Sequence, residues 1–311
     1  MIRCVVEKKR LPTQIRASIE EQIRQTAEKE GRPLETVRRR FVYERFLDRV
    51  FHGDRDGWIL KGGVGMMVRV PNARHSLDID LVGRRGSDSV KALIELVKIE
   101  TDPFRYSISP KRETSSIEGT RLTVIVSLGG RKFEQFRIDL VSYRSLVGEV
   151  ERRPLTSVVD DKHGDFPKNA DSIQLYPLAD QIADKICAIH ETHGAGHPSS
   201  RPRDLVDLLL ICEHLQLDLA GVVASVVAER DRRGITLPEM MAPPRLWSSK
   251  WSGDNNVIHH LDRTLHVFDQ AVETVGHCFN RVLSHVADGS TPGAVIWVPH
   301  YQRWDDFPVA S

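Results

Sequence analysis

The sequence has few cysteines and no long apolar run. Its four cysteines include no CxxC pair, which argues against a zinc ribbon and against a disulfide framework. No uninterrupted apolar stretch reaches the ~18 residues of a membrane span, and the first residues lack the apolar core of a signal peptide. We therefore expect reduced thiols, no membrane partner and a cytoplasmic location.

The chain also lacks an excess of charge of either sign. Its 44 Lys and Arg residues against 43 Asp and Glu residues give a formal net charge of +1, so no global positive field indicates a nucleic-acid partner. RNA binding would have to come from local basic clusters, although a solvated helix face is the simpler interpretation of such clusters. The candidates for RNA contact are Arg38, Arg39 and Arg203.

Internal repeats and low-complexity segments are absent too, and the 311 residues suffice for two domains. In the first half, apolar periodicity predicts helices and strands in turn: a helix over 12–30, a second through Phe41 and Leu47, a strand at 58–60, a short helix to 70, a strand over 76–82, a helix over 88–99 and a hairpin of 121–128 with 136–140. In the second half the periodicity is mostly helical, over 178–192, 203–215, 218–230 and roughly 257–287. The order predicts an α+β domain in 1–150, with a helical N-terminal preface, followed by a mainly helical domain in 151–311.

Two aspartates share one face of a predicted strand. In Ser76-Leu77-Asp78-Ile79-Asp80-Leu81, the apolar residues alternate with Ser76, Asp78 and Asp80. Alternation places the two carboxylates side by side, roughly 6 to 7 Å apart at their Cα atoms. Such a pair repels itself unless a cation neutralises it, and Mg²⁺ prefers oxygen ligands.

A third carboxylate, Asp139, lies in a later strand between Ile138 and Leu140. If the two strands pair, the three aspartates converge and form a candidate two-metal site for an in-line displacement at phosphorus. The alternative for a lone Asp-x-Asp is surface decoration. The preceding Gly62-Gly63 turn and the later Asp139 strand favour the metal site.

Together these elements resemble the nucleotidyltransferase superfamily, which has a glycine turn, an apolar-flanked Asp-x-Asp and a third acid on a later strand. More narrowly, the chain resembles the AbiEii-type (MenT-like) nucleotidyltransferase toxins of type IV toxin–antitoxin systems. The resemblance rests on Leu60-Lys61-Gly62-Gly63, Arg74-His75-Ser76-Leu77-Asp78-Ile79-Asp80-Leu81, Tyr176-Pro177-Leu178-Ala179-Asp180-Gln181-Ile182-Ala183-Asp184-Lys185 and Arg203-Asp204-Leu205-Val206-Asp207-Leu208. The spacer between Gly63 and Asp78 is slightly long, and Val64-Gly65 stands where the family usually has Thr or Ser.

The resemblance implies a nucleotidyltransferase-like mixed sheet, with the second half completing the active-site cleft. Backbone N–H groups at Gly62 and Gly63 would meet phosphate at a helix start, although a plain tight turn is equally open. Ser76 and Lys61 are further phosphate candidates, and a hydrogen-bonded strand serine is the alternative for Ser76.

Lys185 lies at the edge of the apolar stripe of its predicted helix. The family resemblance makes it a cation on the triphosphate, whereas the alternative is a lysine that extends along the core edge to water. Asp204 and Asp207 open the next helix, where carboxylates also stabilise the dipole, and the resemblance favours a functional role for at least one. His190, His193 and His197 have metal-like spacing, but no nearby ligand completes a zinc set.

The predicted activity is transfer of a nucleoside monophosphate from an NTP, with Asp78, Asp80 and Asp139 holding Mg²⁺. The resemblance implies that the acceptor is the 3′ end of tRNA, that transfer blocks aminoacylation and translation, and that a cognate antitoxin is encoded nearby. Two alternatives stay open: an enzyme of this fold acting on a small molecule such as an antibiotic, and a catalytically inactive nucleotide or RNA binder.

Overall fold

The chain has an α+β fold built on one large mixed sheet. In the computed structural model, the described residues are 10–70, 73–110, 119–161, 163–194, 196–251 and 261–306. The strands of the sheet lie in the order β3-β4-β5-β2-β1-β7-β6. Their bounds are β1 Trp58–Lys61, β2 Asp78–Gly83, β3 Phe104–Pro110, β4 Gly119–Leu128, β5 Arg131–Ser142, β6 Glu151–Arg153 and β7 Ile173–Leu175.

The helices confirm most of the predicted pattern. Those of the first half are α1 Pro12–Glu30, α2 Leu34–Gly53, α3 Gly62–Arg69 and α4 Ser89–Val97, and those of the second are α5 Leu178–His190, α6 Pro202–His214, α7 Leu219–Arg233, α8 Ser248–Trp251 and α10 Phe268–Asp288. Helix α1 has the predicted ends because Pro12 occupies its first turn and Gly31, at φ 63°, ends it in the left-handed conformation.

Contacts divide the chain into two compact units. The first consists of 1–60, 77–143 and 152–174, and the second of 61–76, 144–151 and 175–311. Each unit is therefore made of three segments that alternate along the chain, whereas the predicted division into 1–150 and 151–311 has a single boundary. The assignment of a catalytic domain to 1–150 and of a mainly helical domain to 151–311 stays a prediction.

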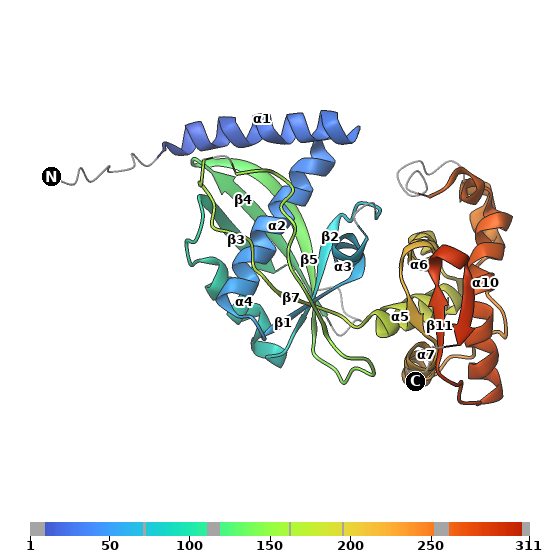
Figure 1. Cartoon of the computed structure of the whole chain (residues 1–311). Coiled ribbons are helices and arrows are strands. Elements are labelled where there is room, and N and C mark those ends of the chain that lie inside the picture. The colour runs from blue at the N-terminus through green and yellow to red at the C-terminus, as the bar shows by residue number, and fades with distance from the viewer. Residues whose placement is uncertain are drawn as a thin grey trace, which may run out of the picture. The chain divides into compact units, whose positions relative to one another are not determined.

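In the first unit, α2 lies across one face of the sheet (Figure 1). Phe46 of α2 packs edge-on against Phe136 of β5 and Tyr106 of β3, with ring centroids 5.3 and 5.4 Å apart. Buried charged residues of the same helix form hydrogen bonds to later parts of the chain. Arg49 donates to Asp102 at 2.6 Å, and the Ala170 backbone N–H donates to Asp48 at 2.6 Å. The apolar face of the sheet is thus covered, and its polar face carries the aspartates.

The second unit is held by one apolar cluster, to which α3, α5, α6, α7 and α10 contribute buried residues. A small sheet of β10 Leu217–Asp218, β11 Val295–Val298 and β12 Arg303–Asp306 packs on these helices. The indole of Trp297 donates to the Cys212 carbonyl at 2.8 Å, and that of Trp304 donates to the Cys278 carbonyl at 2.9 Å. A further pair, β8 Thr192–His193 with β9 His197–Pro198, closes a short hairpin.

Two expectations differ from the structure, and several strands were not expected. The helix expected over 257–287 begins at Phe268, because Asp262 caps a short 3-10 turn over Arg263–His266. Residues 257–260 of that prediction lie outside the described residues. Cys4 also lies outside them. Leu77 was expected on the apolar face of its strand but is 41 % exposed, because β2 begins only at Asp78. Strands β3 and β6 to β12 were not predicted.

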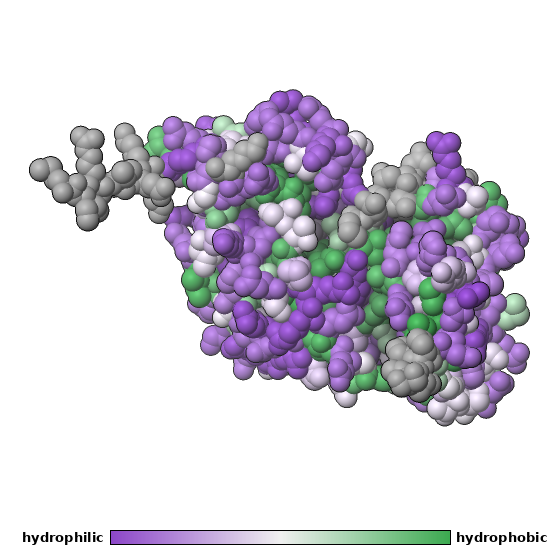
Figure 2. Space-filling view, viewed as in Figure 1, coloured by the Kyte–Doolittle hydropathy of each residue, from purple (hydrophilic) through white to green (hydrophobic). Residues whose placement is uncertain are grey.

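The described helices include none with both the length and the apolar character needed to cross a membrane. On the face shown in Figure 2, hydrophilic residues dominate over α1, and hydrophobic residues reach the surface in small separate patches.

Candidate active site

The first group of candidate residues lies on β2 and β5. These strands are parallel neighbours, and their register places Asp80 beside Asp139 and Asp78 beside Arg137. Ile79 and Ile138 are fully buried, so the aspartates between the buried positions project from the opposite, solvent-facing side of the sheet. Neighbouring strands are about 4.8 Å apart. The backbone therefore brings Asp78, Asp80 and Asp139 to one patch of the sheet.

Asp139 has a specific partner on the other neighbouring strand. Arg121 of β4 lies directly opposite Asp139, and its Nε and Nη2 donate to the two carboxylate oxygens at 2.7 and 2.8 Å. The hydrogen bond and the charge of Asp139 raise the pKa of Arg121, and the charges of Asp78 and Asp80 raise it further. The charges of all three aspartates thus raise the pKa of one guanidinium.

A second arginine approaches the other end of the patch, where Arg137 Nη2 lies 3.9 Å from Asp78 Oδ2. Within the described residues, no three His, Cys, Asp or Glu side chains are gathered closely enough to hold a metal ion. The donor set nevertheless fits a hard cation, since it consists of half-exposed carboxylates at adjacent backbone positions. Arg121 supplies the positive charge that such a cation would otherwise supply.

The glycine turn has a defined geometry in the second unit. Gly62 begins α3 with φ 65°, a conformation that favours glycine. A Cβ atom on Gly63 would lie 2.7 Å from Ser76 Oγ, so these two residues are in direct contact. Ser76 is 4 % exposed. The Gly62-Gly63 pair therefore shapes the start of a helix and packs against a predicted phosphate contact.

Lys61, just before the glycines, is engaged with acidic and aromatic neighbours. Its Nζ lies 3.6 Å from Asp184 Oδ2 and 5.3 Å from the centre of the Tyr176 ring. Its side chain is only partly exposed, at 25 %. A phosphate ligand would compete with Asp184 for this ammonium.

Lys185 occupies a buried ion-pair cluster. Its Nζ donates to Asp204 at 3.0 Å and to Asp207 at 2.5 Å. Asp207, which is fully buried, also accepts a hydrogen bond from Nη2 of Arg74 at 2.8 Å, and Nε of Arg74 lies 2.8 Å from its other carboxylate oxygen as an ion pair. Asp204 in turn contacts Arg201 at 2.9 Å. The cluster joins α5, α6 and the segment that leads to Ser76.

Burial and charge act in opposite directions on this cluster. Burial lowers the pKa of Lys185, but the charges of Asp207 and Asp204 outweigh burial, and the net pKa is raised. Burial raises the pKa of Asp207, but Lys185 and Arg74 outweigh it, and the net pKa is lowered. Lys185 and Asp207 are therefore both charged at neutral pH. Both predicted aspartates touch Lys185, so the structure does not separate their roles.

The remaining candidates are dispersed. The guanidinium of Arg38 lies 5.7 Å from the centre of the Phe133 ring, Arg39 lies 3.7 Å from Glu134, and Arg203 is exposed at the start of α6. His193 and His197 face each other in the β8-β9 hairpin, and both are exposed. His190 is partly buried, with Nδ1 2.8 Å from the Ile186 carbonyl and Nε2 accepting from the Ala242 N–H at 3.1 Å.

Three arginines that contact candidate residues, Arg121 and Arg137 in the first unit and Arg74 in the second, were not among the predicted site residues. For Arg121 and Arg137 a signal existed, because each alternates with buried apolar residues and so shares the aspartate face of the sheet. Arg74 opens one of the segments that resemble the family, but its partner Asp207 is 133 residues away, so the ion pair itself was not predictable from local sequence.

Comparison with known proteins identifies the family. Residues 45–273 match the family model described as nucleotidyl transferase AbiEii toxin, Type IV TA system. The solved structure of MenT4, a nucleotidyltransferase toxin from Mycobacterium tuberculosis, is similar with a TM-score of 0.56 and 17 % identity, covering 86 % of this chain and 89 % of that one. JHP933 from Helicobacter pylori matches at a TM-score of 0.42 and 16 % identity, covering 79 % of this chain and 90 % of that one. Among curated proteins, none is similar enough in sequence to count as a relative.

The family match extends over most of the chain and includes every predicted catalytic residue. The chain therefore belongs to the AbiEii nucleotidyltransferase toxin family, and the similarity to MenT4 supports the fold.

Proposed function

We propose that this member of the AbiEii family transfers a nucleoside monophosphate from an NTP to the 3′ end of tRNA. The observation that supports the proposal best is the register of β2 and β5, which sets Asp80 beside Asp139 on the solvent-facing side of the sheet and Asp78 one alternation away. In the reaction, the 3′ oxygen of the acceptor bonds to the α-phosphorus, the bond to the β-phosphate breaks, and pyrophosphate and the hydroxyl proton leave.

Asp78, Asp80 and Asp139 are the residues that would hold Mg²⁺. When bound, the metal neutralises charge on the phosphates and lowers the pKa of the attacking hydroxyl. The protein's own contribution is to fix three carboxylates on adjacent rigid strands, so that little is reorganised when the ligands bind. Arg121 keeps Asp139 neutralised and ordered, and its release from Asp139 would provide a cation beside the phosphates.

The nucleotide's phosphates are assigned to the glycine turn and its neighbours. The N–H groups at the start of α3 and the Ser76 hydroxyl are donors, and anions are stabilised at helix N-termini. Lys185 and Lys61 stay candidates for the triphosphate. Their present partners are aspartates, so each would either exchange a carboxylate for phosphate or act by fixing the backbone around Gly63 and Ser76.

The acceptor and the biological effect follow from the family resemblance. A nucleotide added to the 3′ end of tRNA blocks aminoacylation, which stops translation and growth. Type IV toxin–antitoxin membership implies a cognate antitoxin, and we propose that it is encoded nearby. Arg38, Arg39 and Arg203 are proposed RNA contacts.

The acceptor can be tested with total RNA, Mg²⁺ and each of the four α-labelled NTPs in turn. We expect label in RNA of tRNA size, and we expect periodate oxidation of the RNA to abolish labelling because it destroys the 3′ diol. Label on a small molecule, or labelling that survives oxidation, would contradict transfer to a 3′ end.

A further inference from the structure

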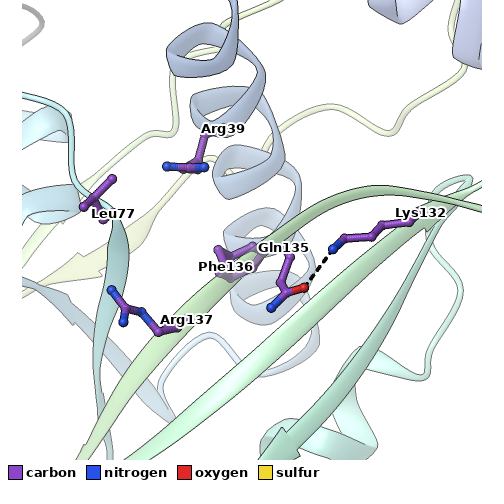
Figure 3. Close-up of a pocket in the computed structure, with 6 residues that line it drawn as sticks. All are labelled: Arg39, Leu77, Lys132, Gln135, Phe136 and Arg137. Carbon is purple, nitrogen blue, oxygen red and sulfur yellow. Dashed lines mark hydrogen bonds between the residues drawn. The ribbon is translucent and has the colours of Figure 1, made fainter.

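A hollow of about 430 Å³ opens beside the aspartate patch in the first unit. Figure 3 shows the side chains around it, with Arg39 coming from α2 and Arg137 from β5. The lining residues are Arg39, Leu77, Lys132, Gln135, Phe136 and Arg137.

The hollow exists because β2 is shorter than β5. Pairing between these strands begins at Asp78 with Arg137, so the earlier residues of β5 extend beyond the start of β2. Leu77 lies at this point and is 41 % exposed, whereas Phe136 is buried beneath. The surface offered to a ligand therefore combines an apolar edge with the polar side chains of β5.

The lining carries three cations and no carboxylate. Arg39 is 3.7 Å from Glu134 and Arg137 is 3.9 Å from Asp78, and both distances exceed a hydrogen bond. Lys132 donates to the neutral Gln135 amide at 2.8 Å. Among the described residues, the buried Nε of Arg39 has no hydrogen-bond partner. The positive charge here is only loosely compensated, and an anion would complete it.

We propose that this hollow binds backbone phosphates of the acceptor RNA strand, next to the nucleotide that carries the reacting 3′ hydroxyl. The proposal rests on the proposed function. Arg137 is the strand neighbour of Asp78, so a phosphate bound at Arg137 lies within one nucleotide of the carboxylates.

The spacing of the cations favours a chain of phosphates. The Cα atoms of Lys132 and Arg137 are five positions apart on β5, roughly 16 Å along a strand, and the Lys132 ammonium lies beside Gln135, between those two ends. A polynucleotide backbone distributes its charges over such a length, whereas a triphosphate concentrates them on three consecutive groups. Leu77 and the edge of Phe136 suit the apolar faces of a sugar or base.

The test compares Lys132→Glu with Lys91→Glu, since both lysines are exposed in the first unit and Lys91 lies on α4, outside the hollow. The probes are a fluorescein-labelled oligouridylate, followed by anisotropy over a range of salt, and a fluorescent ATP analogue. We expect Lys132→Glu to weaken oligouridylate binding about tenfold and to lower the salt slope by about 1. Lys132→Arg should bind as the parent does, and the ATP analogue should bind all variants equally.

Oligouridylate affinity and salt slope that are unchanged in Lys132→Glu would overturn the proposal, as would a parent protein that binds no oligouridylate. A loss confined to the ATP analogue would overturn it too and would assign the hollow to the nucleotide's phosphates. A parent protein that binds oligouridylate through Lys132 but transfers no nucleotide to any RNA would support the hollow and contradict the proposed function alone.

Discussion

The guanidinium of Arg121 and the carboxylate of Asp139 form a two-pronged ion pair across adjacent antiparallel strands, at 2.7 and 2.8 Å. The pair occupies one of the three carboxylates that we propose as metal ligands. A metal ion bound there would compete with Arg121 for Asp139.

Removing this competitor should strengthen metal binding. Exposed ion pairs contribute about 0.2–1 kcal/mol, so we expect Arg121→Gln to raise Mn²⁺ affinity by at most about fivefold, measured by the loss of the free-Mn²⁺ signal in electron paramagnetic resonance. Arg105→Gln is the matched control, because it removes another exposed arginine, 3.2 Å from Glu100. Weaker Mn²⁺ binding by Arg121→Gln would show that Arg121 supports the metal site.

Gly63→Ala should destabilise the fold through one contact. The new Cβ would lie 2.7 Å from Ser76 Oγ, and overpacking of this kind costs about 1–3 kcal/mol. Adding Ser76→Gly removes the obstructing atoms, so the double variant should recover most of the loss in urea denaturation. Equal instability of the single and double variants would place the strain elsewhere.

Lys185→Ala should cost far more stability than an exposed lysine does. It leaves buried Asp204 without its lysine partner and buried Asp207 with Arg74 only, and breaking a buried pair costs about 3–5 kcal/mol. Lys91→Ala serves as the exposed control. A loss below about 1 kcal/mol by urea denaturation would contradict the buried-cluster account.

A transfer assay on the same protein tests the proposed triphosphate role. Where the protein stays folded, Lys185→Ala should slow single-turnover transfer by about 10² to 10³-fold. Lys185→Arg should restore transfer only in part, because the guanidinium differs in size and direction from the ammonium. Near-parental transfer by folded Lys185→Ala would limit Lys185 to a structural role.

His190 should make stability depend on pH. Burial lowers the pKa of His190 below 6.5, so the unfolded chain binds a proton more readily than the folded chain does. The free energy of unfolding contributed by His190 is therefore present above pH 6.5 and is lost as the pH falls from there toward the folded-state pKa. His190→Asn should flatten this part of the profile relative to the exposed control His214→Asn. Parallel profiles for the parent and His190→Asn would refute the assignment.

The strands of the site were predictable from sequence, but their exact partners were not. A two-residue turn at Gly129-Gly130 pairs Leu128 with Arg131, and continuing that register would place Arg121 opposite Ile138. A bulge between Val126 and Ser127 shifts the register by one residue, which brings Arg121 opposite Asp139. The buried positions of β5 do change parity between Phe133 and Phe136, and this is the sequence signal of the bulge.

Other features depend on contacts that no local pattern encodes. Strand β3 has only two buried alternating residues, Phe104 and Tyr106, before it turns polar, so its signal is short. The assignment of Lys185 to an apolar stripe edge was a local inference, and its two aspartate partners come from the next helix. Neither could be derived without the tertiary structure.

The most direct test of the central claim compares the parent protein with Asp80→Ala. Both are incubated with labelled NTPs, Mg²⁺ and tRNA, and expressed at equal levels to follow growth. We predict that the parent labels tRNA, that EDTA abolishes this labelling by removing the metal, and that the parent arrests growth. Asp80→Ala should neither label tRNA nor arrest growth. Its thermal stability should hold or rise, because a like-charge repulsion is removed. An Asp80→Ala protein that still labels tRNA or still arrests growth would contradict the assignment of the reacting centre to these strands.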